Sequence, residues 1–103
     1  MRDLKGKVSY ITGGSKGIGY GVAETLLKQG MRVAISGRNK QDLEKASKRL
    51  GETNVLSLVS DVCNIADEKA AVQKILDRWG RLDVVVANAG VGHFAPVDQL
   101  EVE

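Results

Sequence analysis

The sequence predicts an α/β fold built on a doubly wound parallel sheet. Four short apolar segments alternate with three longer segments in which apolar residues recur every three or four positions. The short segments are apolar almost throughout, which is typical of strands that crossover helices bury on both faces. A glycine-rich stretch, TGGSKGIG at Thr12–Gly19, joins the first strand segment to the first helical one. This order of segments indicates one sheet with helices on both sides.

The first strand and helix flank the glycine-rich stretch. Val8–Ile11 (VSYI) is the first predicted strand, and Gly17–Gln29 is the first predicted helix. Ile18, Val22 and Leu26 recur at intervals of four within that helix. Ala23 and Leu27 stand beside them. Because residues three or four apart share one face of a helix, we expect these five side chains to form one face.

The pattern then repeats with a second helix between two further strands. Arg32–Ser36 (RVAIS) and Asn54–Ser60 (NVLSLVS) are the second and third predicted strands. Lys40–Leu50 is the helix between them. Asn39, followed three residues later by Asp42, resembles a capping box and predicts where that helix begins.

The last predicted elements are a third helix and a fourth strand. The helix is expected to begin after a cap at Asn64 and to end at Trp79. The strand is expected to comprise Leu82–Ala87 (LDVVVA). The apolar stripe of this helix is expected to lie in the core and consists of Val72, Ile75, Leu76 and Trp79. Cys63 has no Cys or His partner at metal-ligand spacing, so we expect a small, buried or half-buried residue and no metal site.

Length and composition restrict the function classes. With 103 residues, the chain is expected to form one domain over residues 1–103. The formal charge of +2 is too small to indicate binding to nucleic acid or to an anionic membrane. We see neither a secretory signal nor an apolar run long enough to span a membrane. A single cysteine cannot form an internal disulfide, so we expect a cytoplasmic protein.

The position of the glycine-rich stretch indicates a phosphate site. Glycines between a strand and a helix let a ligand approach the backbone closely, and the helix start offers unpaired N–H groups and partial positive charge. Two common loop patterns do not fit. A Walker A loop counted from Gly14 would need a lysine after Gly19, where Tyr20 stands. The G-x-G-x-x-G pattern counted from Gly17 fails because Val22 occupies the place of its third glycine.

A third pattern, T-G-x-x-x-G-x-G, fits Thr12, Gly13, Gly17 and Gly19, and with it the chain resembles the short-chain dehydrogenase/reductase family. Two further motifs support the resemblance. Asp61-Val62 resembles the pair that contacts adenine in this family, and Asn88-Ala89-Gly90 resembles its N-A-G motif, although ANAG replaces the commoner NNAG. All three motifs follow predicted strands, at the edge where open parallel sheets bind ligands.

The resemblance implies a Rossmann-type sheet with strand order 3-2-1-4, incomplete in this chain, and a nicotinamide cofactor. The residues that it assigns to the cofactor site are Thr12, Gly13, Ser15, Lys16, Gly17, Ile18, Gly19, Gly37, Arg38, Asn39, Asp61, Val62, Asn88, Ala89 and Gly90. NAD-binding relatives usually carry an acid at the end of the second strand, but Gly37 stands there. Arg38 and Lys16 can pair with a 2′-phosphate, and Ser15 can donate to it. We therefore expect NADP(H) rather than NAD; the alternative is that both cations are solvated surface residues.

The catalytic pair of the family is missing from this chain. The family's reaction is hydride transfer between nicotinamide and a carbonyl or alcohol, with a Y-x-x-x-K pair in which lysine lowers the pKa of tyrosine. The only tyrosines are Tyr10 and Tyr20, and Gly14 and Glu24 stand four positions later. The resemblance thus covers the amino-terminal, cofactor-binding part of an enzyme whose substrate is a small molecule. We expect this part alone to be inactive and the full-length protein to be a homo-oligomer.

Two classes of function remain open. The chain is either the front part of an NADP-dependent oxidoreductase or a non-catalytic nucleotide-binding module, for instance the remnant of a truncated gene. A Y-x-x-x-K pattern encoded after Glu103 would indicate the enzyme, and a stop codon there would indicate the remnant.

Overall fold

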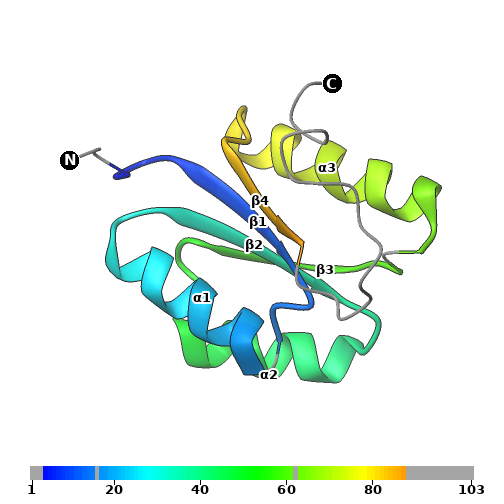
Figure 1. Cartoon of the computed structure of the whole chain (residues 1–103), viewed down its shortest axis with the longest axis horizontal. Coiled ribbons are helices and arrows are strands. Elements are labelled where there is room, and N and C mark those ends of the chain that lie inside the picture. Colours follow the sequence, from blue (N-terminus) through cyan, green and yellow to red (C-terminus); the bar gives the residue numbers. More distant parts are fainter. Residues whose placement is uncertain (1–3, 16, 62, 88–103) are drawn as a thin grey trace.

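The computed structural model describes residues 4–15, 17–61 and 63–87 and confirms the predicted α/β architecture (Figure 1). Its strands are β1 (Val8–Thr12), β2 (Arg32–Gly37), β3 (Val55–Val59) and β4 (Val84–Ala87), and its helices are α1 (Gly17–Lys28), α2 (Lys40–Leu50) and α3 (Ile65–Trp79). The strands are parallel and lie in the expected order, β3-β2-β1-β4.

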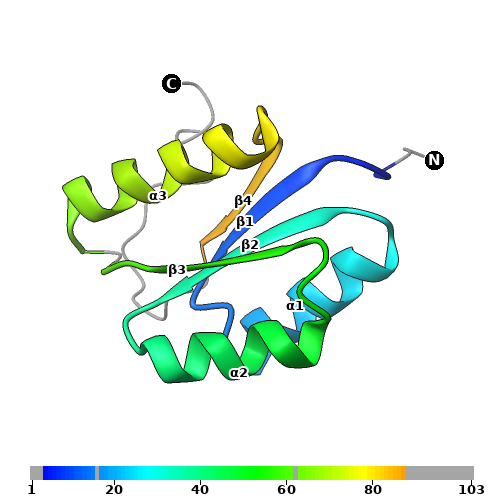
Figure 2. The same ribbon diagram turned by 180° about the vertical axis from the view of Figure 1, so that it is seen from behind.

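Helices cover both faces of the sheet. Helices α1 and α2 lie on one face and α3 lies on the other, as the two opposite views in Figures 1 and 2 show. The core beneath α1 and α2 contains Ile11, Ile35 and Leu43, and the core beneath α3 contains Val8 and Ile75. Each such fully buried side chain contributes about 1.5–3 kcal/mol to the free energy of folding. The apolar strands are therefore explained by burial on both sides.

Strand β1 is central, and its register aligns the carboxyl ends of the strands. Thr12, its last residue, lies opposite Ser36 of β2 and Ala87 of β4. Gly37 at the end of β2 lies opposite Val59 of β3. Because the strands are parallel and end together, the segments that follow them share one edge of the sheet.

The buried face of α1 agrees with the predicted one except at Ile18. Gly19 and Ala23 are buried against the sheet, whereas Ile18 is 78% exposed. Val22 and Leu26 pack only partly against the core. Leu27 also packs against the core, so Ile18 alone departs from the predicted face. Small residues at the contact allow α1 to lie close to the sheet, which the apolar spacing alone did not reveal.

Two helix caps match the sequence. The side-chain oxygen of Asn39 accepts a hydrogen bond of 3.0 Å from the backbone N–H of Asp42 at the start of α2. Asn64 accepts an equivalent bond of 3.0 Å from Asp67 at the start of α3. Such caps satisfy N–H groups that have no partner within the helix and contribute about 1 kcal/mol each.

Three local expectations about burial and strand limits were wrong or only partly right. The fourth strand begins at Val84, two residues later than predicted. Leu76 is 39% exposed, because Ala71 and Ile75 form the buried centre of α3. Cys63 is exposed because it lies in the turn between β3 and α3 rather than on an element.

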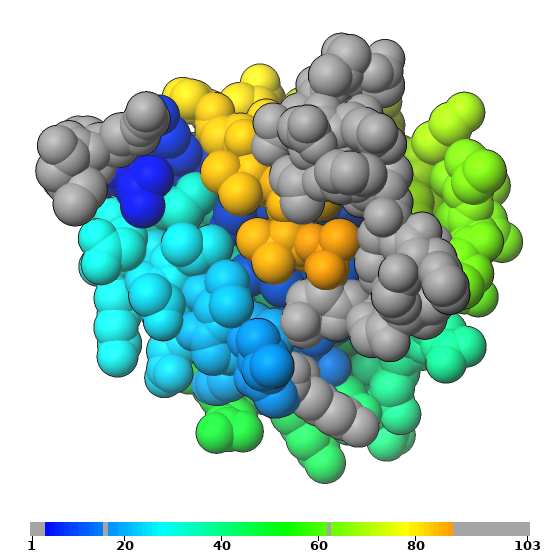
Figure 3. All heavy atoms as spheres, viewed as in Figure 1, coloured from blue at the N-terminus to red at the C-terminus, as the bar shows by residue number. Residues whose placement is uncertain are grey.

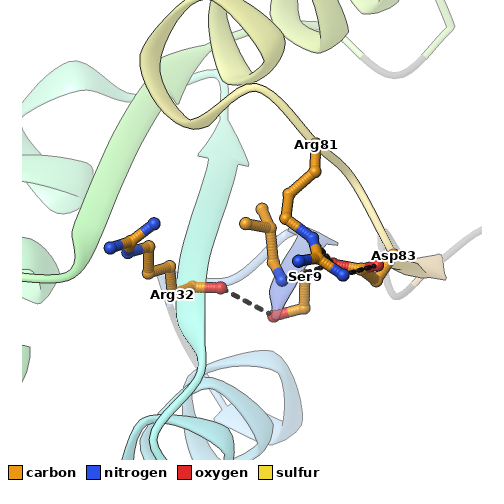
Figure 4. Close-up of polar contacts among 5 residues, drawn as sticks. Ser9, Arg32, Arg81 and Asp83 are labelled. Atoms are coloured by element: carbon orange, nitrogen blue, oxygen red, sulfur yellow. Dashed lines mark hydrogen bonds and ion pairs between the residues drawn. The ribbon is translucent and has the colours of Figure 1, made fainter. Parts of the chain in front are cut away.

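Asp83 ties the amino ends of β1 and β4 together. Its carboxylate accepts a hydrogen bond of 2.8 Å from the backbone N–H of Val8, and its own N–H donates to the carbonyl of Val8 at 2.8 Å. Arg81 donates two bonds of 2.9 Å to the same carboxylate, and Figure 4 shows this pair beside Ser9. The Arg81 guanidinium is the main reason why the pKa of Asp83 is lowered, and the Val8 N–H lowers it further.

Strand β4 lies at one margin of the sheet and is only partly covered. All four of its residues are partly exposed, and Figure 3 shows its atoms (orange) at the surface. Within the described residues, no strand pairs with its outer side. In the part of the chain that the structure describes, no helix is long and apolar enough to cross a membrane.

Candidate functional site

The candidate site lies along the carboxyl edge of the sheet. Thr12 ends β1 and the described residues 13–15 and 17–19 follow it; Gly37 ends β2 and residues 38–39 follow it; Asp61 stands two positions after β3. The shared register brings these segments to the same edge, as expected. Five residues assigned to the site by resemblance lie outside the described part of the chain; they are Lys16, Val62, Asn88, Ala89 and Gly90.

The start of the glycine loop is anchored to β2. The backbone N–H groups of Gly13 and Gly14 both donate to the carbonyl of Ser36, at 2.9 and 3.2 Å. Gly13 has a φ of +70°, a conformation that favours glycine. The Thr12 side chain is buried and donates to the carbonyl of Val86 at 3.4 Å. The first residues of the motif therefore connect β1 to both neighbouring strands.

Gly14 is required by packing, a role that sequence reasoning missed. A Cβ atom at this position would lie 2.5 Å from Cγ2 of Ile35 and 3.3 Å from the carbonyl oxygen of Ile11. Real Cβ atoms do not approach carbon so closely. Two adjacent glycines in the sequence were the available signal, but the contact with a residue on another strand was not visible in it.

The beginning of α1 is suited to an anion. Gly17 is exposed, has a φ of +57°, and would have open space around an added Cβ atom. The first turn of α1 contains no acidic residue, whereas α2 carries Asp42 and α3 carries Asp67 and Glu68 in theirs. Because the first N–H groups of a helix carry partial positive charge, a phosphate can approach α1 without meeting a carboxylate on its first turn.

The end of β2 lies against the glycine loop. A Cβ atom on Gly37 would be 3.7 Å from the hydroxyl oxygen of Ser15 and 3.7 Å from Leu43, which are ordinary contacts. Arg38 is exposed immediately after the strand. The side-chain oxygen of Asn39 is engaged in capping α2, so the structure gives this residue a structural task beside its predicted one.

Asp61 is held in a hydrogen-bonded turn. Its carboxylate accepts a bond of 2.9 Å from the N–H of Cys63, and its carbonyl accepts one of 2.8 Å from Asn64. Its own N–H donates to the carboxylate of Asp67 at 3.0 Å. The first turn of α3 thus fixes the residue that the resemblance assigns to the adenine contact.

Four polar side chains beneath this edge were not singled out in the sequence. Tyr10, Ser36, Ser60 and Glu68 form one hydrogen-bonded group between the sheet and α3. Burial is the main reason why the pKa of Tyr10 is raised, and the charge of Glu68 raises it further. The signal was a serine at the end of each of two apolar strands, facing the same side as Tyr10. No cluster of candidate metal ligands occurs among the residues described.

Comparison with known proteins identifies the family. The model of the short chain dehydrogenase family matches residues 7–103, nearly the whole chain. The chain belongs to this family. Short-chain dehydrogenases are oxidoreductases that use NAD or NADP, and the residues described here form part of their cofactor-binding fold.

Individual short-chain dehydrogenases agree with this assignment. An uncharacterized oxidoreductase of Staphylococcus haemolyticus is 37% identical over 103 residues, which are all of this chain and 45% of that protein. A short chain dehydrogenase from Bacillus anthracis superposes with a TM-score of 0.83 at 36% identity, covering 96% of this chain and 41% of that one. A 3-ketoacyl-(acyl-carrier-protein) reductase from Brucella melitensis, crystallised with NADH, superposes with a TM-score of 0.81 at 39% identity. This match covers 87% of this chain and 37% of that one. The chain spans less than half the length of these relatives.

Proposed function

We propose that this chain is the cofactor-binding part of an NADP(H)-dependent oxidoreductase that transfers hydride between nicotinamide and a small carbonyl or alcohol substrate. The nicotinamide ring, when bound, supplies or accepts the hydride. The residues of this chain bind and orient the adenosine and phosphate groups, and its sequence contains no Y-x-x-x-K pair that would give a proton to the substrate. The activity is proposed for a full-length protein that contains this chain.

The end of β2 carries the preference for NADP. Gly37 stands where an acid would accept hydrogen bonds from the adenosine ribose and repel a 2′-phosphate. The exposed guanidinium of Arg38 follows directly, and the Ser15 hydroxyl lies beside the Cβ position of Gly37. Two cations and a hydroxyl donor are suited to a phosphate, if Lys16 also approaches the group.

Space does not explain why the acid is missing. An added Cβ on Gly37 would make only ordinary contacts with Ser15 and Leu43, and the backbone is not in the left-handed region. An aspartate is therefore compatible with this position. We infer that glycine leaves room for a phosphate rather than relieving a steric conflict.

Measured affinities for NADPH and NADH test the proposal. A charge-assisted hydrogen bond to phosphate contributes about 1.5–3 kcal/mol. Arg38→Ala is therefore expected to weaken NADPH binding at least about tenfold and to leave NADH binding nearly unchanged. Gly37→Asp and Arg38→Asp are expected to reverse the preference. Lys48→Ala removes an exposed cation at the far end of α2 and is the matched control.

Equal affinities of the unmodified protein for the two cofactors would contradict the NADP preference. The relative crystallised with NADH makes this comparison necessary, since family members differ in the cofactor that they bind.

A non-catalytic nucleotide-binding module is the alternative. Neither tyrosine of this sequence is followed by a lysine four positions later. Tyr10 is also buried in a hydrogen-bonded group, where it cannot reach a substrate. The coding sequence after Glu103 distinguishes the two functions.

A further inference from the structure

The buried polar group beneath the carboxyl edge connects three strands to one helix. Tyr10 comes from β1, Ser36 from β2, Ser60 follows β3, and Glu68 lies in α3. The three hydroxyl-bearing side chains are 2–4% exposed. The Tyr10 oxygen lies 3.1 Å from the Ser36 hydroxyl and 2.9 Å from the Glu68 carboxylate, and Ser60 donates to the same carboxylate.

The chemistry of these groups sets the direction of the hydrogen bonds. An ionised carboxylate only accepts, so Tyr10 and Ser60 both give their single hydroxyl proton to Glu68. The Tyr10 oxygen can then accept the proton of Ser36. Glu68 is the acceptor at which both chains of hydrogen bonds end. Replacing it leaves two buried hydroxyl groups without their partner, which is costly in a buried environment.

Each serine in this group also holds a segment of the cofactor site. The Ser36 carbonyl accepts the N–H groups of Gly13 and Gly14 at the start of the glycine loop. The N–H of Ser60 donates to the carbonyl of Gly37 at 2.9 Å. Ser60 also directly precedes Asp61. The side-chain group and the site backbone therefore share the same two strand ends.

We propose that Glu68 is a positioning residue for the adenosine half of the cofactor site. It acts through Tyr10 and Ser60, which fix the ends of β2 and β3, and it does not contact the ligand. This role rests on the proposed function. It predicts that the hydrogen-bonded side chains around Glu68 fix the relative positions of the glycine loop, the end of β2 and Asp61. Replacing Glu68 is then expected to weaken adenosine binding although Glu68 does not contact the ligand.

Calorimetric titration with adenosine 2′,5′-bisphosphate tests this role without requiring catalysis. Glu68→Gln keeps the size of the side chain but replaces one acceptor oxygen by an amide donor. We expect its affinity to fall at least about tenfold, the loss that corresponds to about 1.4 kcal/mol. Tyr10→Phe and Ser60→Ala should each give a smaller loss, because each removes one bond to Glu68. Asp77→Asn changes an exposed acid on the same helix and should bind like the unmodified protein.

Affinity measured well below the unfolding midpoint separates positioning from stability. A purely structural role would lower the midpoint of Glu68→Gln but leave the affinity of its folded form unchanged, and that result overturns the inference. If Glu68→Gln does not fold, the affinity of folded Tyr10→Phe is measured instead, and an unchanged affinity again overturns the inference. If the unmodified protein binds neither the bisphosphate nor NADPH, the proposed function fails and this inference fails with it. Unchanged affinity of the variants beside normal binding by the unmodified protein overturns the inference alone.

Discussion

Gly14 packs directly against Ile35: a Cβ atom on the glycine would lie 2.5 Å from Cγ2 and 2.8 Å from Cβ of the isoleucine. Both isoleucine atoms are buried in the core beneath α1 and α2, so they cannot move aside freely. Gly14→Ala is therefore expected to destabilise the fold by about 1–3 kcal/mol, the usual cost of an overpacked core.

A second glycine provides the matched comparison. An added Cβ atom on Gly21, in the interior of α1, would meet nothing within 4 Å. Because glycine costs about 0.5–1 kcal/mol relative to alanine within a helix, Gly21→Ala is expected to stabilise the protein. Chemical denaturation of both variants measures the difference. Destabilisation by Gly21→Ala, or none by Gly14→Ala, would contradict the packing described here.

Gly17→Val is expected to abolish nucleotide binding. The residue is exposed at the start of α1, and a β-branched side chain there would occupy the space in which a phosphate approaches the backbone. Its φ of +57° also makes the substitution strained. Gly80→Val is the control, since Gly80 has a φ of +75°, open surroundings and a place at the carboxyl end of α3. Equal loss of NADPH affinity in both variants would show that strain alone is responsible.

Tyr10 is expected to make stability depend on pH in the alkaline range. Its pKa is raised in the folded protein, above the value of about 10 expected in the unfolded chain. The folded state thus favours the neutral phenol. This contribution is complete below about pH 10 and is lost as the pH rises towards the folded pKa. Denaturation of the unmodified protein and of Tyr10→Phe between about pH 8 and pH 11 checks it, because the variant should lack this component of the decline.

Asp83 is expected to make stability depend on pH in the acidic range. Its pKa is lowered mainly by the hydrogen bonds from Arg81. Its contribution is therefore present above the unfolded value of about 3.9 and is lost as the pH falls through the folded pKa. Because the ion pair is partly exposed, Asp83→Asn should cost no more than about 1 kcal/mol at neutral pH. Measured free energies of unfolding of the two proteins should begin to converge as the pH falls below about 4 and should meet below the folded pKa of Asp83; a constant difference would argue against the ion pair.

The fold was predictable because its signals are local or periodic. Apolar strands, helices of suitable length and the caps at Asn39 and Asn64 are all visible within a few residues of sequence. Strand order came from the family resemblance, and the register of the strands brings the described parts of the glycine loop, Gly37 and Asp61 to one edge.

Contacts between distant residues explain what could not be predicted. Spacing alone placed Ile18 on the buried face with Ala23, but Gly19 faces the sheet beside Ala23 and Ile18 is exposed. The need for Gly14 depends on Ile35, which belongs to another strand. Tyr10 and Glu68, 58 positions apart, are brought together only by the packing of α3 on the sheet.

The central position of β1 also has a consequence for the order of folding. The hydroxyl of Ser9 donates to the carbonyl of Arg32, 23 positions later. The N–H of Val8 donates to the carboxylate of Asp83, 75 positions later. Figure 4 shows both partners on either side of the same strand. Pairings between distant residues form more slowly, because a longer loop must lose conformational entropy before the stabilising contact can form. On a ribosome, β1, β2 and β3 can associate while β4 is still being synthesised. The side of β1 that pairs with β4 therefore stays unpaired until β4 has been synthesised.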